Sequence, residues 1–153
     1  MAAVTPFLWF NDQAEEAMRF YVDLFPNSHV NSVTRHGDDD APAFSVDFSI
    51  NGQQFQAING GPHHALTPGF SVFVSCADQE EVDRLWAALS EGGEESQCGW
   101  VTDRFGLTWQ VIPTALMALL SDPDAERAGR AMQAMLGMQK IDVAELERAA
   151  SGR

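Results

Sequence analysis

Apolar positions along the chain twice change from the alternation of a strand to the spacing of a helix. A short apolar stretch, TPFLWF, precedes Asp12–Leu24, where apolar residues recur at helical spacing. A second stretch, FSVFVSC, precedes a similar segment, Asp78–Leu89. Both segments begin with Asp-Gln and carry two glutamates in the first turn, where the helix dipole favours carboxylates. Asp12 and Asp78 are therefore the predicted N-caps of two helices.

Each predicted helix is followed by strands that end in a matching motif. NGQQFQAI begins at Asn51 and FGLTWQVI begins at Phe105, and both place an aromatic residue directly before a glutamine. Upstream of the first motif, HVNSVTRHG and AFSVDFSI alternate as strands do, and Asn51-Gly52 predicts a tight hairpin. In the second copy, the turn DRFG joins two short strands. The chain therefore reads as strand, helix and strands, written twice.

The repeat predicts one compact domain with three segments. Residues 1–62 form a first βαβββ module, residues 63–113 form a second, and residues 114–153 form a helical extension. Within the extension, Ser121 or Asp122 is the predicted cap of one helix and Asp142 the cap of the next. Its methionine-rich stripe is expected to pack against the domain or a dimer partner.

Composition limits the partners and the compartment. The chain has 22 acidic and 9 basic residues, and its net charge of −13 repels nucleic acids and anionic membranes, so neither is expected as a partner. No signal-peptide pattern or membrane-spanning apolar run is present in the sequence. Two cysteines, Cys76 and Cys98, do not make a disulfide framework. A cytoplasmic location is therefore expected.

Strand alternation assigns the aromatic residue and the glutamine of each motif to opposite faces. Phe55 and Trp109 suit the face packed against the helices, so Gln56 and Gln110 would face the other side. Because the repeat relates the two glutamines by an approximate two-fold axis, they are predicted to lie on opposite walls of one cavity. The alternative is that the glutamines only hydrogen-bond to each other across that cavity.

Four segments, PFLWFNDQAEEAMRFY, NGQQFQAINGGP, DQEEVDRLW and CGWVTDRFGLTWQVIP, resemble the PhnB-like subgroup of the vicinal oxygen chelate superfamily. This superfamily includes glyoxalase I, extradiol dioxygenases and bleomycin-resistance proteins, and the subgroup is also filed as 3-demethylubiquinone-9 3-methyltransferase-like. The resemblance covers essentially the whole chain. It implies an α+β fold, in which two tandem βαβββ modules form a curled half-barrel cup next to C-terminal helices, and a homodimer. It does not define a reaction, because one fold hosts several chemistries.

Metal-using members of the superfamily place His or Gln on the first strand of a module and Glu on the last. Carried over by motif, these positions fall near Thr5 and Ser71 and on Gln56 and Gln110. Such neutral oxygen donors bind transition metals poorly. No cofactor is therefore expected, and a divalent metal is disfavoured. A metal-dependent lyase or dioxygenase of the same superfamily stays open as an alternative.

The predicted cup contains amides, hydroxyls and aromatic rings, which suit a small, partly planar organic ligand. A non-catalytic protein that sequesters a drug would use the same cup, whereas a purely structural dimer would have a filled one. A methyltransferase is not indicated, because no glycine-rich nucleotide-binding turn is found, and no catalytic residue is predicted. The predicted ligand contacts are Thr5, Phe7, Trp9, Gln56, Asn59, His63, Ser71, Trp100 and Gln110.

Four other features have competing interpretations. His63, in the connection between modules, could bind a metal or act as a general base, or it could be a surface residue. Asn59 either stabilises a turn or contacts a ligand at the rim. Cys98 lacks an identifiable base and is expected to be structural rather than nucleophilic. The loop Asp38–Asp40 lacks EF-hand spacing and is expected to be solvated.

Overall fold

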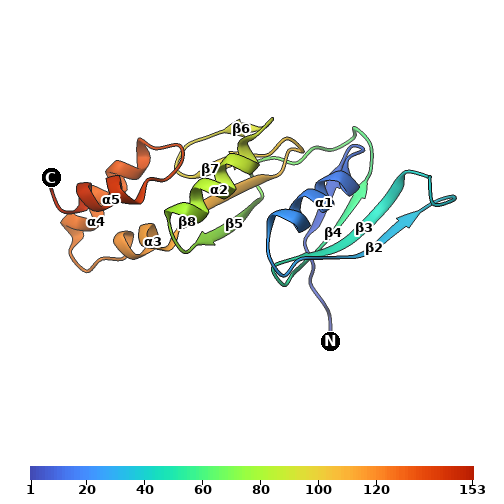
Figure 1. Cartoon of the computed structure of the whole chain (residues 1–153), viewed down its shortest axis with the longest axis horizontal. Helices are drawn as coiled ribbons and strands as arrows, with labels where there is room; N and C mark the ends of the chain where they lie inside the picture. Colours follow the sequence, from blue (N-terminus) through green and yellow to red (C-terminus); the bar gives the residue numbers. More distant parts are fainter. The chain divides into compact units, whose positions relative to one another are not determined.

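The computed structural model describes residues 1–153, which form two compact units, Met1–Leu66 and Thr67–Arg153. Each unit contains a four-stranded mixed sheet and a helix that follows the first strand (Figure 1). The predicted α+β class, with two βαβββ units and C-terminal helices, is confirmed. None of the helices is both long and apolar enough to span a bilayer.

The first unit has its strands in the order β1-β4-β3-β2, with β1 parallel to β4 and the other neighbours antiparallel. The only helix of this unit, α1, covers one face of the sheet, so the other face is open within the unit (Figure 1). We call that second face the first open face. The elements in chain order are β1 (Phe7–Phe10), α1 (Ala14–Leu24), β2 (His29–Arg35), β3 (Ala43–Ile50) and β4 (Gln53–Asn59).

Aromatic side chains fill the core between α1 and the sheet. Phe48 and Phe55, which are paired across β3 and β4, stack with their ring centroids 5.6 Å apart. Tyr21 on α1 is fully buried, with its ring centroid 6.5 Å from that of Phe48. Phe55 therefore lies on the helix side, as predicted, and its neighbour Gln56 lies on the first open face.

A β-bulge interrupts the alternation predicted for the second strand. Val30 pairs with Phe48 and Ser32 pairs with Asp47, so the register shifts at Asn31. The sequence predicts Val30 and Ser32 on one face, which is wrong because the extra residue of the bulge separates them. The bulge also brings the Asn31 side chain to Asp47, where Nδ2 donates to Oδ1 at 2.9 Å.

Helix α1 is capped by a residue from the end of β4. The helix begins after Gln13, whose side chain makes no capping hydrogen bond, and Asp12 is not the cap. Instead the backbone N–H of Ala14 donates to Oδ1 of Asn59 at 2.8 Å, and Asn59 Nδ2 donates to the carbonyl of Ala43 at 3.0 Å. The prediction for Asp12 is wrong because an amide 45 positions along the chain from Ala14 caps the helix.

The second unit repeats this topology, with the strand order β5-β8-β7-β6. Its strands β6 and β7 are short, with two and three residues. Asp78 caps α2 as predicted, accepting from the backbone N–H of Glu81 at 2.9 Å. The elements are β5 (Ser71–Cys76), α2 (Gln79–Ser90), β6 (Glu94–Glu95), β7 (Trp100–Thr102), β8 (Thr108–Pro113), α3 (Thr114–Leu120), α4 (Ala125–Leu136) and α5 (Val143–Ala150).

A buried carboxylate organises the hairpin between β7 and β8. Asp103 is 3% exposed, and its Oδ1 accepts from the backbone N–H groups of Phe105 and Leu107 at 2.9 and 3.1 Å. Its Oδ2 accepts from the indole N–H of Trp109 at 2.9 Å. The predicted turn is confirmed, since the N–H of Gly106 donates to the Asp103 carbonyl. Trp109 is completely buried, on the helix side as predicted.

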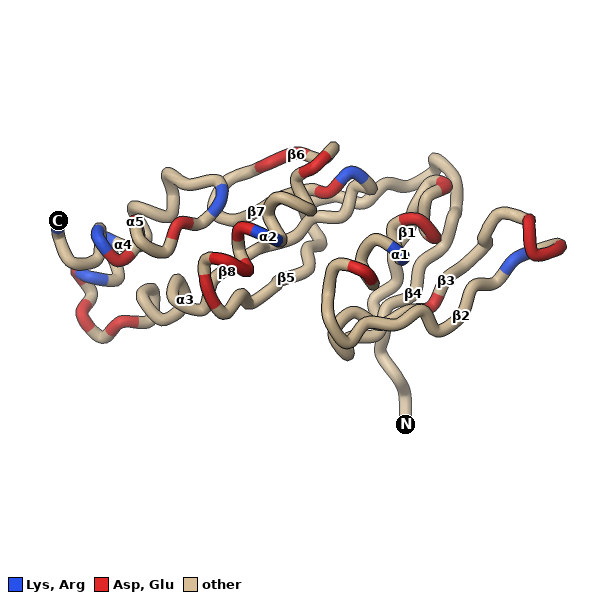
Figure 2. The backbone as a smooth tube through the Cα atoms, in the orientation of Figure 1, with Lys and Arg blue, Asp and Glu red and all other residues tan.

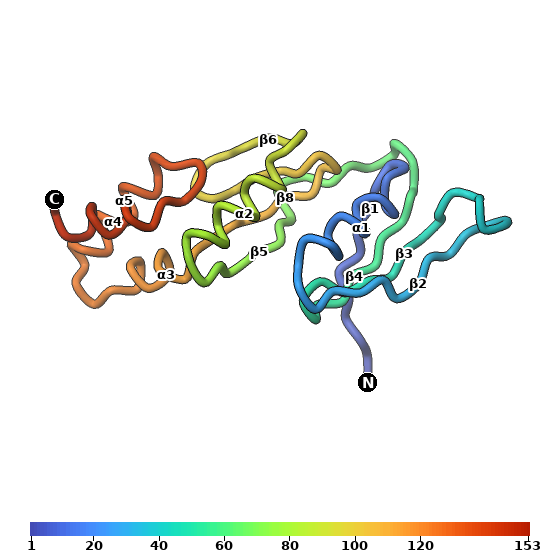
Figure 3. The backbone as a smooth tube through the Cα atoms, in the orientation of Figure 1, coloured from blue at the N-terminus to red at the C-terminus, as the bar shows by residue number.

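The helical extension, residues 114–153, belongs to the second unit and packs against the end of β8. Ile112 at the end of β8 and Leu116 on α3 form a buried cluster with Ile141 and Leu146. Figure 3 traces this path from β8 through α3 and α4 to α5. Asp142 caps α5 as predicted. The remainder of this cluster comprises the partly buried Leu119, Leu120, Ala134, Met135 and Met138.

The start of α4 and its apolar stripe differ from the sequence prediction. Asp124 is the N-cap, accepting from two backbone N–H groups, so the predicted caps Ser121 and Asp122 are wrong. The predicted methionine-rich stripe includes Ala131, Met132, Met135 and Leu136, of which Met132 and Leu136 are exposed. Only part of this stripe is therefore buried within the second unit.

Candidate functional site

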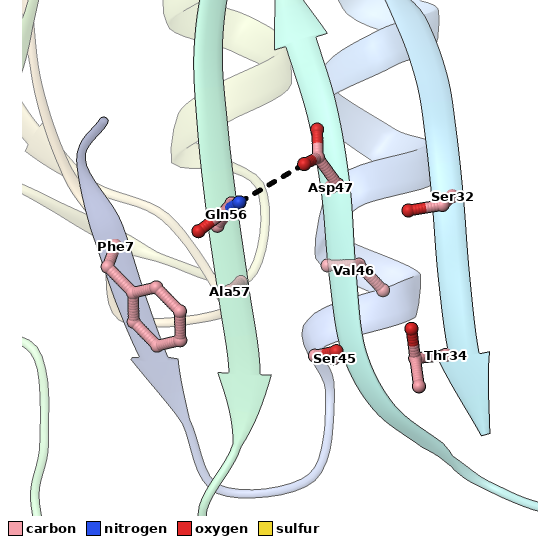
Figure 4. A pocket seen from close by; sticks show the side chains of 8 residues that line it. All are labelled: Phe7, Ser32, Thr34, Ser45, Val46, Asp47, Gln56 and Ala57. Carbon is pink, nitrogen blue, oxygen red and sulfur yellow. Dashed lines mark hydrogen bonds between the residues drawn. The ribbon is translucent and has the colours of Figure 1, made fainter. Parts of the chain in front are cut away.

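The first open face carries a row of three side chains across adjacent strands. Phe7 on β1 pairs with Gln56 on β4, and Gln56 pairs with Asp47 on β3. Directly paired residues project from the same face of a sheet, so these three side chains are neighbours. Gln56 Nε2 donates to Asp47 Oδ2 at 3.2 Å (Figure 4). Phe7 is 56% exposed, which leaves its ring accessible beside the amide.

A shallow hollow of about 210 Å³ lies on the first open face. Its lining is polar apart from one aromatic ring and two small aliphatic residues (Figure 4). Hydroxyl groups from β2 and β3 lie on the side of the row away from Phe7. The complete lining is Phe7, Ser32, Thr34, Ser45, Val46, Asp47, Gln56 and Ala57.

Two amides hold the carboxylate of Asp47. Asn31 donates to Oδ1 and Gln56 donates to Oδ2, so each oxygen accepts one N–H bond. Asn31 Nδ2 also donates to Oε1 of Gln54 at 3.0 Å, which links β2 to β4. Asp47 is half-buried and takes part in none of the ion pairs of the molecule. The geometry thus fixes a negatively charged group on an otherwise neutral surface.

The second unit presents an equivalent face, which we call the second open face. Gln110 on β8 pairs with Phe73 on β5 and with Trp100 on β7. Phe73 is 47% exposed, like its counterpart Phe7. Gln110 Nε2 donates to the hydroxyl of Ser71 at 3.0 Å. Both sheets therefore place a glutamine directly beside an exposed phenylalanine.

Six of the predicted ligand contacts lie on these two faces, within their own units. Phe7, Trp9 and Gln56 are together on the first open face, and Ser71, Trp100 and Gln110 are together on the second. Thr5 precedes β1 and is half-buried. The curled cup shared by both faces stays a prediction of the sequence.

Asp47 was not among the predicted contacts, although the sequence contains a signal for it. In AFSVDFSI, strand alternation puts Asp47 on the same face as Ser45 and Ser49 and on the other face from Phe48. A charged residue in the middle of a strand, on the face shared with Gln56, could have marked the site. Its two amide donors come from other strands, one of them at a bulge, and sequence spacing does not reveal them.

Trp9 lies on β1, two residues after Phe7 and on the same face, whereas Asn59 and His63 lie at the end of β4 and in the loop that follows. Trp9 donates its indole N–H to the carbonyl of Gly61 at 3.0 Å, and its ring meets the ring of His64 edge-on at 4.7 Å. A Cβ atom on Gly60 would lie 2.2 Å from the Trp9 ring, so only glycine fits there. Asn59 caps α1, and His63 is exposed.

The two cysteines do not form a reactive centre. Burial, reinforced by Glu81, raises the pKa of the Cys76 thiol to about 11, so this thiol stays protonated at neutral pH. Cys98 adopts a φ of 60° and Gly99 a φ of 84°, and the N–H of Trp100 donates to the carbonyl of Gln97. These values correspond to a type I′ turn, in which Cys98 has a structural role.

The donors on the two faces do not fit a transition-metal site. No group of three or more His, Cys, Asp or Glu residues lies close enough to hold a metal ion. Within the first unit, the superfamily's carboxylate position is Gln56, and its only acidic neighbour in the row is Asp47. One carboxylate and neutral amides make a weak set of ligands for Zn²⁺ or Fe²⁺.

Comparisons with known proteins agree with the topology. The sequence family described as 3-demethylubiquinone-9 3-methyltransferase matches residues 2–112. The structure of a PhnB protein from Bacillus cereus is 30% identical, has a TM-score of 0.68, and the match covers 73% of this chain and 99% of that one. A protein from Pseudomonas aeruginosa, at 21% identity and a TM-score of 0.61, shares the fold over 74% of this chain and 98% of its own. A search of curated proteins gave no match.

Two βαβββ modules, each with a helix on one face of its sheet and a glutamine on the other, define a protein of the vicinal oxygen chelate, or glyoxalase and bleomycin-resistance, type. Within this class, the chain belongs to the PhnB-like family described as 3-demethylubiquinone-9 3-methyltransferase, as its sequence motifs predict. The family match ends at residue 112, so the helical extension lies outside it.

Proposed function

We propose that the protein binds a small, partly planar organic molecule on the open faces of its sheets. The observation that carries this proposal is the pairing of an exposed phenylalanine with a glutamine at the same register in both units. Phe7 pairs with Gln56, and Phe73 pairs with Gln110. A ring provides a stacking surface and the adjacent amide provides both a donor and an acceptor, a combination typical of small-molecule sites.

The proposal covers binding and assigns no reaction. The donor chemistry supports a ligand held without a tightly bound metal, because Thr5, Ser71 and the two glutamines are neutral oxygen donors. We do not propose methyl transfer, since both sheets are mixed and neither is the doubly wound parallel sheet that holds nucleotides. The cytoplasmic location and the homodimer stay predictions, and light scattering of the full chain tests the latter.

A fragment titration followed by NMR tests the proposed function. The full chain, labelled with ¹⁵N, is titrated with a library of planar aromatic amides. We expect saturable shifts of backbone amides in β4 or β8, and we expect Gln56→Leu or Gln110→Leu to weaken binding about five-fold on its own face.

Gln13→Leu is the matched control, because Gln13 is exposed and makes no capping bond through its side chain. This variant should bind the fragments as the wild-type chain does. Absence of saturable shifts on both faces would contradict the proposal and would favour a purely structural role for the two sheets.

A further inference from the structure

We infer that the first open face selects a cationic organic group, with Asp47 as the charge-recognising residue. This inference rests on the proposed function and specifies its ligand class. Asp47 lies in the row with Phe7 and Gln56, and its carboxylate lines the hollow on the first open face. A ligand that reaches Gln56 therefore also reaches a fixed negative charge.

No cation of the first unit neutralises this carboxylate. Apart from its histidines, the stretch of residues 1–66 contains two basic residues, Arg19 and Arg35, and no lysine. Both arginines donate to the same oxygen of Glu15 on α1 at 2.8 Å, so they are engaged by the helix. Figure 2 shows the positions of the Lys, Arg, Asp and Glu residues along the backbone. The partners of Asp47 are the neutral amides of Asn31 and Gln56, which orient the carboxylate without cancelling its charge.

The hollow offers mainly hydrogen-bond acceptors to a ligand. Figure 4 shows the Gln56 amide with its nitrogen toward Asp47 and its oxygen on the side of Phe7. That oxygen, the carboxylate and the hydroxyls of Ser32, Thr34 and Ser45 can all accept. Ammonium, amidinium and guanidinium groups carry several donors and no acceptor, so they complement this lining better than neutral or anionic groups do.

The aromatic end of the row adds a second attraction for a cation. The exposed ring of Phe7 stands at the rim of the hollow beside Gln56 (Figure 4). An aromatic face attracts a cation placed within about 6 Å of its centroid. A hollow of about 210 Å³ is smaller than a complete drug-sized pocket, so it suits the charged head of a larger molecule.

The second open face does not share this selectivity. The position equivalent to Asp47 is occupied by Trp100, which pairs with Gln110 just as Asp47 pairs with Gln56. The inferred cation preference is therefore a property of the row that contains Asp47, and the row that contains Trp100 lacks a carboxylate. This difference gives the experiment an internal reference within the same chain.

Three probes of nearly equal shape test the inference: benzamidinium is cationic, benzamide is neutral and benzoate is anionic. Each is titrated into the full ¹⁵N-labelled chain at low salt. We expect benzamidinium to shift amides around Asp47 and Gln56 and to bind about ten-fold more tightly than benzamide, with benzoate weaker still. Asp47→Asn should abolish this preference, and added salt should reduce it.

Asp23→Asn is the matched control, because it removes the same charge from an exposed position on α1. If it weakens benzamidinium binding as much as Asp47→Asn does, the attraction comes from net charge alone and the inference is wrong. If Asp47→Asn disturbs the spectrum of the free protein, Asp47→Ser supplies the second test of the preference.

The outcomes separate this inference from the proposed function. Equal binding of benzamidinium and benzamide would overturn the cation preference and leave the proposed binding face intact. Saturation of neither face by any probe would count against both. A parallel titration with Mn²⁺ tests the inorganic alternative, and tight binding around Asp47 that excludes benzamidinium would overturn the assignment to an organic cation.

Discussion

The two units have the same strand order, and the register of β1, β4 and β3 in the first matches that of β5, β8 and β7 in the second, but the side chains on these strands differ. On each open face, the paired strands place an aromatic ring and a glutamine side by side, and the third member of the row is an aspartate in the first unit and a tryptophan in the second. The backbone therefore fixes which positions project from the open face, and substitution within the row sets the charge that this face presents. The two rows are Phe7–Gln56–Asp47 and Phe73–Gln110–Trp100.

The helix-covered faces of the two sheets also differ in the side chains at equivalent positions. Phe55 in the first unit and Trp109 in the second occupy equivalent buried positions on the last strand. Phenylalanine needs no polar partner, whereas the buried indole N–H needs an acceptor, which Asp103 provides. The second unit thus depends on a buried carboxylate at a place where the first unit has only apolar packing.

The largest effect should follow from Asp103→Ala. This change leaves the N–H groups of Phe105, Leu107 and Trp109 without the acceptor that they share. We expect a loss of about 3–5 kcal/mol in the free energy of unfolding, measured by urea denaturation.

Trp109→Phe makes the second unit resemble the first and provides the control for this prediction. In that background, Asp103→Ala should cost less, because the buried indole donor is gone. An equal cost in both backgrounds would show that the Asp103–Trp109 hydrogen bond does not carry the dependence, and would weaken the comparison between the two cores.

An intermediate effect should follow from removing the helix caps. The capping residue of α1 is Asn59, whereas α2 is capped by its own Asp78, and the position equivalent to Asn59 is Pro113. Asn59→Ala should cost about 2 kcal/mol and Asp78→Ala about 1 kcal/mol, because Asn59 also donates to the carbonyl of Ala43.

Thermal or urea unfolding of the two variants measures this difference. Asn59→Asp is a useful intermediate, since it keeps the acceptor for the first turn of α1 and loses the donor to β3. If Asn59→Ala costs no more than Asp78→Ala, the additional bond to β3 contributes nothing measurable.

The smallest effect should be a pH dependence from surface ion pairs. Hydrogen bonds from Arg35 and then from Arg19 hold the pKa of Glu15 below its usual value of 4.5. The unfolded chain therefore takes up this proton more readily, and the stabilisation is present above about pH 4.5 and is lost as the pH falls through the folded pKa. Glu15→Gln should flatten the stability profile in that range.

Asp83 in the second unit provides the comparison. A hydrogen bond from Lys140 and another from Gln79 lower the pKa of Asp83 in the same direction. Because the Lys140–Asp83 pair is more exposed than the Arg35–Glu15 pair, Asp83→Asn should flatten the profile less than Glu15→Gln does. Urea denaturation at a series of pH values ranks the two, and the reverse order would contradict the prediction.

Local patterns were enough to predict most of the fold. The two helices, the strand alternation and the paired glutamine motifs appear in the sequence because each depends on neighbouring residues. The faces of Phe55 and Trp109 followed from their size and from the period of a strand. These features placed Gln56 and Gln110 on the open faces before any tertiary contact was known.

Apart from the cap of α4, which is Asp124 instead of the nearby Ser121 or Asp122, the errors arise where the structure depends on distant residues. Asp12 is of a residue type that often caps helices, but the hydrogen bond to the N–H of Ala14 comes from Asn59 at the end of β4. Strand alternation does not predict the contact of Asn31 with Asp47, because this contact depends on the β-bulge at Asn31. Sequence spacing gives no access to such contacts, so the hydrogen bonds that hold Asp47 were not predicted.

The hydrogen bonds between the helical extension and the rest of the second unit predict how truncated forms of the protein will behave. The N–H groups of Cys98 and Gly99 donate to the carbonyls of Met138 and Gln139, and Gln79 both donates to the carbonyl of Ile141 and accepts from the N–H of Val143. A chain truncated after β8, where the family match ends, would lose these hydrogen bonds and expose the apolar end of β8 around Ile112 to solvent. Such a fragment should aggregate, because it would expose apolar side chains. In a chimaera of two family members, about the last forty residues should therefore be exchanged together with the second sheet.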